Sequence, residues 1–162
     1  FHTADSALMM YKEPVLWSGP NQLTADSIQL KLRDGQADSL KMFGSAFIIS
    51  KDDSVRFNQI KGRNLLARFR DNQLYKVRVI GNAETIYYAR EEDKTLIGIN
   101  KARSAEMLIF LENNELNTIT YIDKPEAHLY PEKQLTSAFR MRIFVLSLNK
   151  GMQSYTIRYK RG

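Results

Sequence analysis

The sequence predicts an all-β fold built from one structural unit that occurs three times. Apolar and polar residues alternate with a period of two along several runs, a pattern typical of strands with one buried face. Pairs of Asp, Asn or Gly residues, which suit two-residue hairpin turns, separate these runs. The order of strand, turn, strand and corner then recurs, and helical periodicity is hard to find. We therefore expect antiparallel hairpins laid side by side.

The central unit, residues 58–88, shows this order most clearly. Its strands are residues 65–70 and 75–80, they flank the turn Asp71-Asn72, and the second strand ends at the corner Gly81-Asn82. The other two units carry equivalent turns and corners at Asp34-Gly35 with Gly44 and at Asn113-Asn114 with Asp123. In all three units the corner residue follows the second turn residue by nine positions. The constant spacing within a unit supports a repeat with insertions between units.

Each corner is expected to lead into a third strand, and a fourth short strand leads to the next unit. The third strands are predicted at residues 46–50, 83–88 and 126–130. Residues 1–20 resemble the end of a further unit through Lys12, Glu13 and Pro14, which parallel Lys124, Pro125 and Glu126. A single unit cannot bury its apolar face alone, so the units are expected to stack.

One face of the paired strands is apolar in every unit, and we expect it to line the inside of the fold. Its members are Ile28, Leu30, Leu32, Leu40, Met42, Leu65, Phe69, Val77, Val79, Met107, Ile109, Leu111, Ile119 and Tyr121. Ala67 lies on the same face. Two interpretations stay open: a closed core, the default for a β-sandwich, or an open groove that accepts acyl chains.

The pattern stops after Pro131. Two later runs, residues 143–148 and 155–159, predict a terminal hairpin with a long loop. The expected organisation is thus one domain over residues 1–135 and a basic hairpin or tail over residues 136–162. The net charge of +6 comes from this tail, because it holds six bases and no acid while the rest of the chain holds 18 of each.

Composition excludes several classes of protein. No run approaches the ~20 apolar residues of a membrane-spanning helix. The absence of cysteine excludes disulfides, thiolate zinc sites and thiol nucleophiles. No signal peptide is recognisable at the start of the sequence, so an exported protein would be represented here in a mature or trimmed form.

The candidate catalytic residues do not indicate an enzyme. His2 and His128 have no second histidine nearby in the sequence, and the carboxylates at residues 52–53 and 91–93 stand in loops beside bases. A glycosidase would need two carboxylates opposed across a cleft. The basic stripe of Arg68, Arg70, Lys76 and Arg78 is interpreted as a solvated outer face in preference to a contact with phosphorylated sugar, and it does not indicate a nucleic-acid site. We expect no catalytic residue, cofactor, metal or nucleic-acid partner.

Two short motifs resemble the OstA-like family of lipopolysaccharide-transport proteins. Ala25-Asp26 matches the family's lead-in, and Gly81-Asn82 matches its corner. The run from Leu74 to Tyr88 is similar to the form found in Bacteroides-type bacteria. The resemblance covers about residues 4–131, and it departs in the third unit, where Ser104-Ala105-Glu106 and Asp123-Lys124-Pro125 replace the two motifs.

This resemblance implies a twisted, taco-shaped antiparallel β-jellyroll in the periplasm, associated with the outer membrane. It implies a non-enzymatic function, in which lipopolysaccharide or lipid A acyl chains move along the apolar inner face toward the outer membrane. It also implies partners, since OstA-like domains stack on one another through unpaired edge strands. The alternative is a structural or adhesive β-repeat surface protein with a filled core and no lipid ligand.

Overall fold

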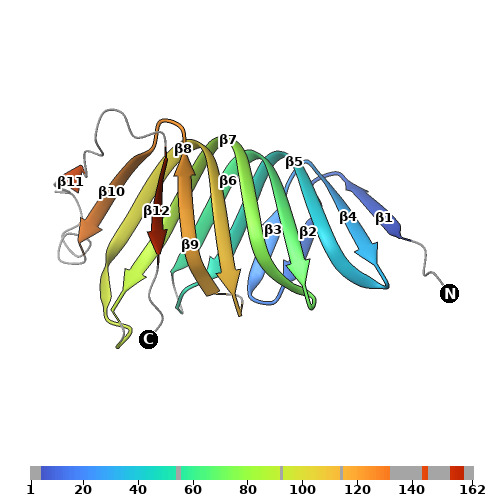
Figure 1. The fold of residues 1–162 in the computed structure, drawn as a ribbon, viewed down its shortest axis with the longest axis horizontal. Helices are drawn as coiled ribbons and strands as arrows, with labels where there is room; N and C mark the ends of the chain where they lie inside the picture. Colours follow the sequence, from blue (N-terminus) through green and yellow to red (C-terminus); the bar gives the residue numbers. More distant parts are fainter. Residues whose placement is uncertain are drawn as a thin grey trace.

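The computed structural model describes residues 5–53, 56–91, 93–113, 115–131, 144–145 and 154–158. These residues form one antiparallel β-sheet without any helix, as the period-two alternation predicts (Figure 1). Within this part of the chain there is accordingly no helix of the length and hydrophobicity needed to cross a membrane. The strands are β1 (Ser6–Tyr11), β2 (Val15–Ser18), β3 (Asn21–Thr24), β4 (Ser27–Arg33), β5 (Gln36–Lys51), β6 (Phe57–Arg70), β7 (Gln73–Arg90), β8 (Leu96–Glu112), β9 (Glu115–Ile122), β10 (Glu126–Pro131), β11 (Phe144–Val145) and β12 (Ser154–Arg158).

The expectation of about four short strands per unit is wrong for the centre of the sheet. The predicted strands at residues 46–50 and 83–88 are the second parts of the long strands β5 and β7, which continue through their corners. At each corner two residues with positive φ, Gly44-Ser45 and Gly81-Asn82, bulge out of the ladder while hydrogen bonding resumes on both sides. A bulge of this kind bends a strand without ending it.

Two further corners have the same positive-φ geometry without glycine, one in the third unit and one near the start of the chain. Asp123 and Lys124 have φ values of 60° and 49° between β9 and β10, and Lys12 and Glu13 have 64° and 56° between β1 and β2. The backbone N–H of Ala105 donates to the carbonyl of Asp123 at 3.0 Å, which joins the corner to the neighbouring strand. The turn residues Asp34, Gly35, Asp71, Asn72 and Asn113 also have positive φ, as hairpin turns of this type require.

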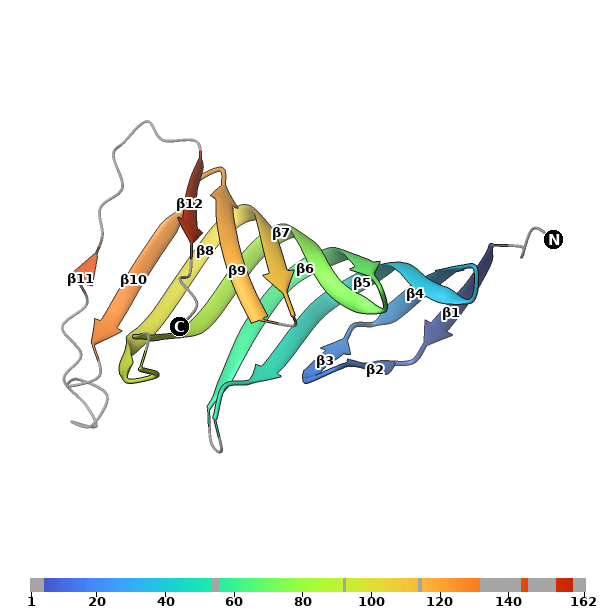
Figure 2. The same ribbon diagram turned by 60° about the horizontal axis from the view of Figure 1, so that its bottom comes forward.

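The corners divide the sheet into two halves that fold toward each other (Figure 2). The first half contains β1, β4, β9, β12 and residues 36–43, 64–70, 73–80 and 106–112 of the long strands. The second half contains β2, β3, β10, β11 and residues 46–51, 57–62, 83–90 and 96–104. We call the boundary between them the fold line.

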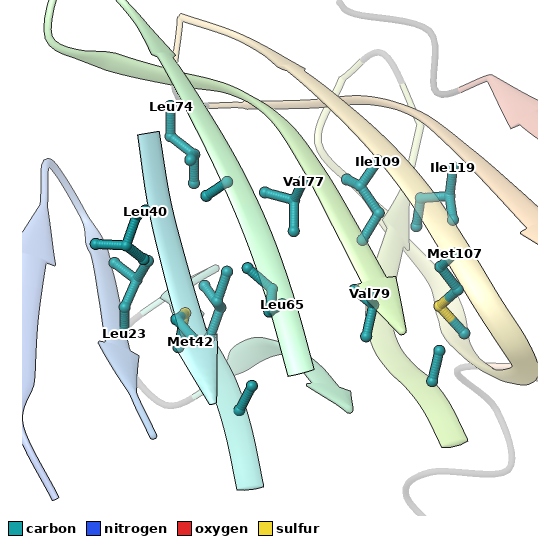
Figure 3. Close-up of a cluster of buried hydrophobic side chains, with 14 of the residues drawn as sticks. Leu23, Leu40, Met42, Leu65, Leu74, Val77, Val79, Met107, Ile109 and Ile119 are labelled. Carbon is teal, nitrogen blue, oxygen red and sulfur yellow. The ribbon is translucent and has the colours of Figure 1, made fainter. Parts of the chain in front are cut away.

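Side chains from both halves form one apolar core between them. Figure 3 shows its larger members projecting from neighbouring strands into a shared space. The second half contributes smaller residues close to the fold line, namely Ala46, Ala83, Ala102 and Ala127. Gly62 belongs to this set, because a Cβ atom at this position would overlap Cγ1 of Val79 in the first half. Small residues therefore let the two halves approach closely where they meet.

The last two strands lengthen both halves at one end of the sheet. β11 pairs with β10 in the second half, and β12 pairs with β9 in the first half. The described residues of the two runs thus pair with β10 and β9 and not with each other, and the rest of the expected hairpin lies outside the described residues. The expected boundary near residue 135 and most of the basic residues of the tail lie outside the described residues.

Candidate functional site

The structure places the predicted inner face in the interior of the folded sheet. Ten of its residues have exposed fractions of 0–2%: Ile28, Leu40, Met42, Leu65, Val77, Val79, Met107, Ile109, Ile119 and Tyr121. The other four, Leu30, Leu32, Phe69 and Leu111, are partly buried. The fully buried residues lie near the fold line and the partly buried ones lie near the hairpin ends, so the interior is filled deep inside and looser at its margin.

A pocket of about 110 Å³ lies between the two halves at this margin. Its first-half lining is apolar and consists of Leu74, Leu111, Leu116 and Ile119. Its second-half lining mixes apolar and polar residues and consists of Asn21, Ile48, Ser50, Asn58, Gln59, Ile60, Thr85, Ile86 and Tyr87. A pocket for a drug-sized ligand is larger, about 300–1,000 Å³. The pocket thus has room for a short segment of an acyl chain.

Two of the apolar lining residues were missed by the sequence analysis because of β-bulges. Strict alternation from Val77 and Val79 would place Tyr75 on the inner face and Leu74 on the outer face. The register shifts between Arg68 and Phe69, which reverses the phase and buries Leu74 to an exposed fraction of 1%. A similar shift beside Leu111 accompanies the inward position of Leu116. Periodicity alone carries no signal for such a shift.

The second-half wall was missed for a different reason. Ile48 and Ile60 pair with each other across β5 and β6 and line the pocket. Their strands carry apolar residues on both faces, as the run Phe47-Ile48-Ile49 illustrates. Alternation therefore could not identify the inner face there. The available signal for this wall was the third strand that follows each corner at Gly44, Gly81 and Asp123.

One buried hydrogen bond joins the two halves beside the pocket. The hydroxyl groups of Thr85 in the second half and Tyr121 in the first half are 3.1 Å apart. Both residues are buried, with exposed fractions of 2% and 0%. Because a buried hydroxyl that loses its partner is costly, this bond opposes separation of the halves.

Two asparagines, Asn21 and Asn58, have structural roles at the polar side of the pocket. Asn21 is buried, and its Nδ2 donates to the carbonyl of Ser18 at 3.2 Å. Oδ1 of Asn58 accepts from the backbone N–H of Tyr88 at 2.9 Å. These two side chains satisfy backbone groups close to strand ends, a role that suits a short polar side chain.

The loop carboxylates are engaged with arginine. The Arg90 guanidinium donates to both carboxylate oxygens of Asp52, at 3.1–3.2 Å from Nε, and to Asp53 at 3.1 Å. The hydrogen bonding of Arg90 to the Asp52 carboxylate is the main reason that the pKa of Arg90 is raised. The pKa of Asp93 is lowered by its hydrogen bonds with Thr95. This network ties the loop after β5 to the loop after β7.

The structure describes one of the two histidines and four of the five loop carboxylates that the sequence analysis considered. His128 lies in β10, and its Nδ1 atom is buried without a hydrogen-bond partner in the described part of the chain. His2 and Glu92 lie outside the described residues. Where side chains are described, no three histidine, aspartate or glutamate side chains are grouped to hold a metal ion.

Comparisons of the chain with family models, with curated proteins and with solved structures found no match.

Proposed function

We propose that this chain is a non-enzymatic module that binds the acyl chains of lipopolysaccharide between the two halves of its folded sheet. The observation that carries the proposal is the margin pocket, which is open between two β layers and has an entirely apolar first-half wall. Apolar lining with a few polar groups at one side is the usual composition of a site for a lipid-like ligand. The function is binding and transfer, and the chemistry of the ligand is left unchanged.

The corner geometry supports a repeat-built jellyroll of the OstA-like type. Positive-φ pairs recur at Lys12-Glu13, Gly44-Ser45, Gly81-Asn82 and Asp123-Lys124. Each pair bends the sheet along the same fold line, including the three pairs that lack the Gly-Asn motif. The repetition of one backbone shape in different sequences is expected of a repeat architecture. On this proposal the module works in the periplasm, at or near the outer membrane.

The burial pattern sharpens which residues contact lipid. Ile60, Leu111 and Leu116 border the pocket and are only partly buried. Leu74 and Ile119 also line the pocket but have exposed fractions of 1%, and Ile109 is fully enclosed away from it. Acyl chains therefore first contact the margin residues. A longer chain requires the halves to separate, and the bond between Thr85 and Tyr121 resists this opening. The deep residues of the predicted inner face stabilise the fold in the closed state.

Edge strands at both ends suit the stacking of like domains. β1 and β2 form one end of the two halves, and β11 and β12 form the other. Leu8, Val15 and Trp17, on the first of these ends, have exposed fractions of 53%, 51% and 68%. Edge strands with exposed apolar side chains are ready to pair with another chain. We propose that stacking through these ends extends the margin pocket from one domain to the next.

The alternative function, a structural or adhesive module without a lipid ligand, is favoured by one observation. Ten of the fourteen predicted lining residues are closed off from solvent. A module of this kind would keep its core filled and would bind partners only through its surface and edges.

Lipid bound to the purified protein distinguishes the two functions. Ile60→Asn places an amide in the pocket wall, and Ile97→Asn makes the same change at a site that is 40% exposed. We expect lipid extraction and mass spectrometry to find lipopolysaccharide with the wild type and with Ile97→Asn, and much less with Ile60→Asn. Equal melting temperatures of the two variants would make the comparison valid. Absence of lipid from the wild type, after exposure to lipopolysaccharide, would favour the structural module.

A further inference from the structure

The outer face of the first half carries a concentration of bases, which we call the basic face. It comprises seven residues: Lys31, Arg33, Lys41, Arg68, Arg70, Lys76 and Arg78. Strand register places Lys31, Arg68 and Lys76 in one cross-strand row and Lys41 and Arg78 in the next. These bases project away from the core, because their neighbours in sequence, Leu40, Ala67 and Val77, are buried and successive side chains of a strand point to opposite faces.

Few carboxylates lie among these bases. Arg33 and Arg68 share Asp38, at 3.7 and 3.6 Å, and Arg78 pairs with Glu106 at 2.9 Å. No ion pair of Lys31, Lys41 or Lys76 occurs within the described ranges. Further acids, Asp34, Asp71 and Glu112, stand at the hairpin ends that border the face. The centre of the basic face, where Lys31, Lys41 and Lys76 stand, is therefore positive.

The outer face of the second half shows the opposite arrangement. Near the fold line its charges alternate along one row, Lys61 with Glu84 at 4.0 Å and Arg103 with Glu126 at 2.7 Å. Neighbouring charges there neutralise each other. Residues 6–11, 27–43, 64–80 and 106–122 of the first half hold seven bases and six acids. The positive character of the basic face therefore arises because four of these acids, Asp34, Asp71, Glu112 and Glu115, are placed at hairpin ends.

An exposed apolar row borders the bases on the side of the fold line. Tyr11, Phe43 and Ile80 stand in this row on β1, β5 and β7. Ser27 of β4 lies between Tyr11 and Phe43, and Asn64 of β6 lies between Phe43 and Ile80. Their exposed fractions are 67%, 41% and 37%. Bases beside exposed apolar side chains are the combination that holds a protein at a membrane surface, with the apolar groups among the lipid headgroups and the bases on the phosphates.

We propose that the basic face binds the surface of an anionic phospholipid bilayer. A single-stranded nucleic acid would need exposed aromatic rings for base stacking. The two rings that lie among the bases are covered, Tyr75 by Arg70 at 4.4 Å and Phe110 by Lys76 at 5.6 Å from the ring centroids. The exposed rings of Tyr11 and Phe43 stand together in the border row and are not interleaved with the bases. A bilayer needs only a broad positive face with an apolar border. This inference does not depend on acyl chains entering the margin pocket.

Vesicle binding by the full chain tests the charge requirement. We expect co-sedimentation with vesicles of phosphatidylcholine and phosphatidylglycerol in equal parts, and loss of it with phosphatidylcholine alone or at high salt. Lys41→Gln with Lys76→Gln should weaken binding about 25-fold, on the basis of about fivefold per lysine. The control Lys61→Gln with Lys101→Gln removes the same charge from the outer face of the second half, which is turned away from the membrane on this proposal. It should change binding less than about threefold, because charges far from the membrane surface are screened. Equal losses in the two double variants, or no binding by the wild type, would overturn the proposal.

Tryptophan fluorescence tests which face meets the lipid. Trp17, the single tryptophan, is 68% exposed and lies in β2 of the second half. Its emission should be unchanged when anionic vesicles are added. A chain with Trp17→Phe and Phe43→Trp should instead shift to shorter wavelength. A shift of Trp17 without a shift of the tryptophan at position 43 would overturn the proposed orientation. Ile60→Asn should bind vesicles as the wild type does, which separates this proposal from acyl binding in the pocket.

Discussion

Gly62 provides a direct test of how the two halves pack at the fold line. Its backbone does not require positive φ, so alanine is permitted by conformation alone. The added Cβ would, however, overlap Cγ1 of Val79, which is fully buried and has a stiff branched side chain. Overpacking of this kind costs about 1–3 kcal/mol. We therefore expect Gly62→Ala to destabilise the protein by about that amount.

A double-mutant cycle identifies the cause. Val79→Ala alone should cost about 1–3 kcal/mol, because it removes two buried methyl groups. It also clears the space that the new Cβ needs, so Gly62→Ala in that background should cost at least about 1 kcal/mol less than in the wild type. Gly35→Ala is the control: it has positive φ and no neighbouring atom, and costs about 1–2 kcal/mol whatever residue occupies position 79.

The free energies of unfolding are measured by urea denaturation, with equal m-values required for all variants. Agreement of the double variant with the sum of the single variants, within about 0.5 kcal/mol, would refute the contact between Gly62 and Val79.

Two further predictions concern links that hold the folded sheet. Tyr121→Phe removes the hydroxyl that bonds to the buried Thr85 hydroxyl and should lower the stability by about 1–2 kcal/mol. The double variant with Thr85→Val should lose less stability than the sum of the two single variants. Additive losses in thermal unfolding would contradict the hydrogen bond between Thr85 and Tyr121. Arg90→Gln should lower stability by about 1 kcal/mol, more than Arg103→Gln, whose side chain is 67% exposed. The ranking is checked by urea denaturation at low and high salt, and a larger loss for Arg103→Gln would contradict it.

The sequence was informative where each residue's environment depends on its immediate neighbours. Alternation predicted that Val77 and Val79 face inward, and both have exposed fractions of 0%. Asp71-Asn72 predicted the hairpin turn, since both residues adopt the positive φ that few other residue types tolerate. The all-β fold follows from these local rules.

Features that depend on partner strands were not predictable in this way. The bulge beside Phe69 arises from pairing between β6 and β7, and it turns Leu74 inward against the alternation. Lys124 adopts a corner conformation that its residue type does not favour, because the surrounding ladder imposes the bend. β12 pairs with β9, which lies far from it in sequence, and no local signal identifies that partner.

The burial of the inner face also changes how lipid binding is tested. Ile109 is fully enclosed, so Ile109→Glu would place a charge in the core and unfold the protein before it reports on lipid. Substitutions at the pocket margin perturb the ligand site with less effect on the fold. Ile60 is the most useful position, because its neighbour Lys61 is exposed on the opposite face of the same strand.

Site-specific photo-crosslinking to lipopolysaccharide tests the central claim most directly. A photo-reactive phenylalanine derivative is placed at Ile60, facing the pocket, or at Lys61, facing outward, in otherwise identical chains. Acyl binding between the halves predicts a lipopolysaccharide adduct from position 60 and none from position 61. Equal adducts from both positions, or an adduct from position 61 alone, would contradict it.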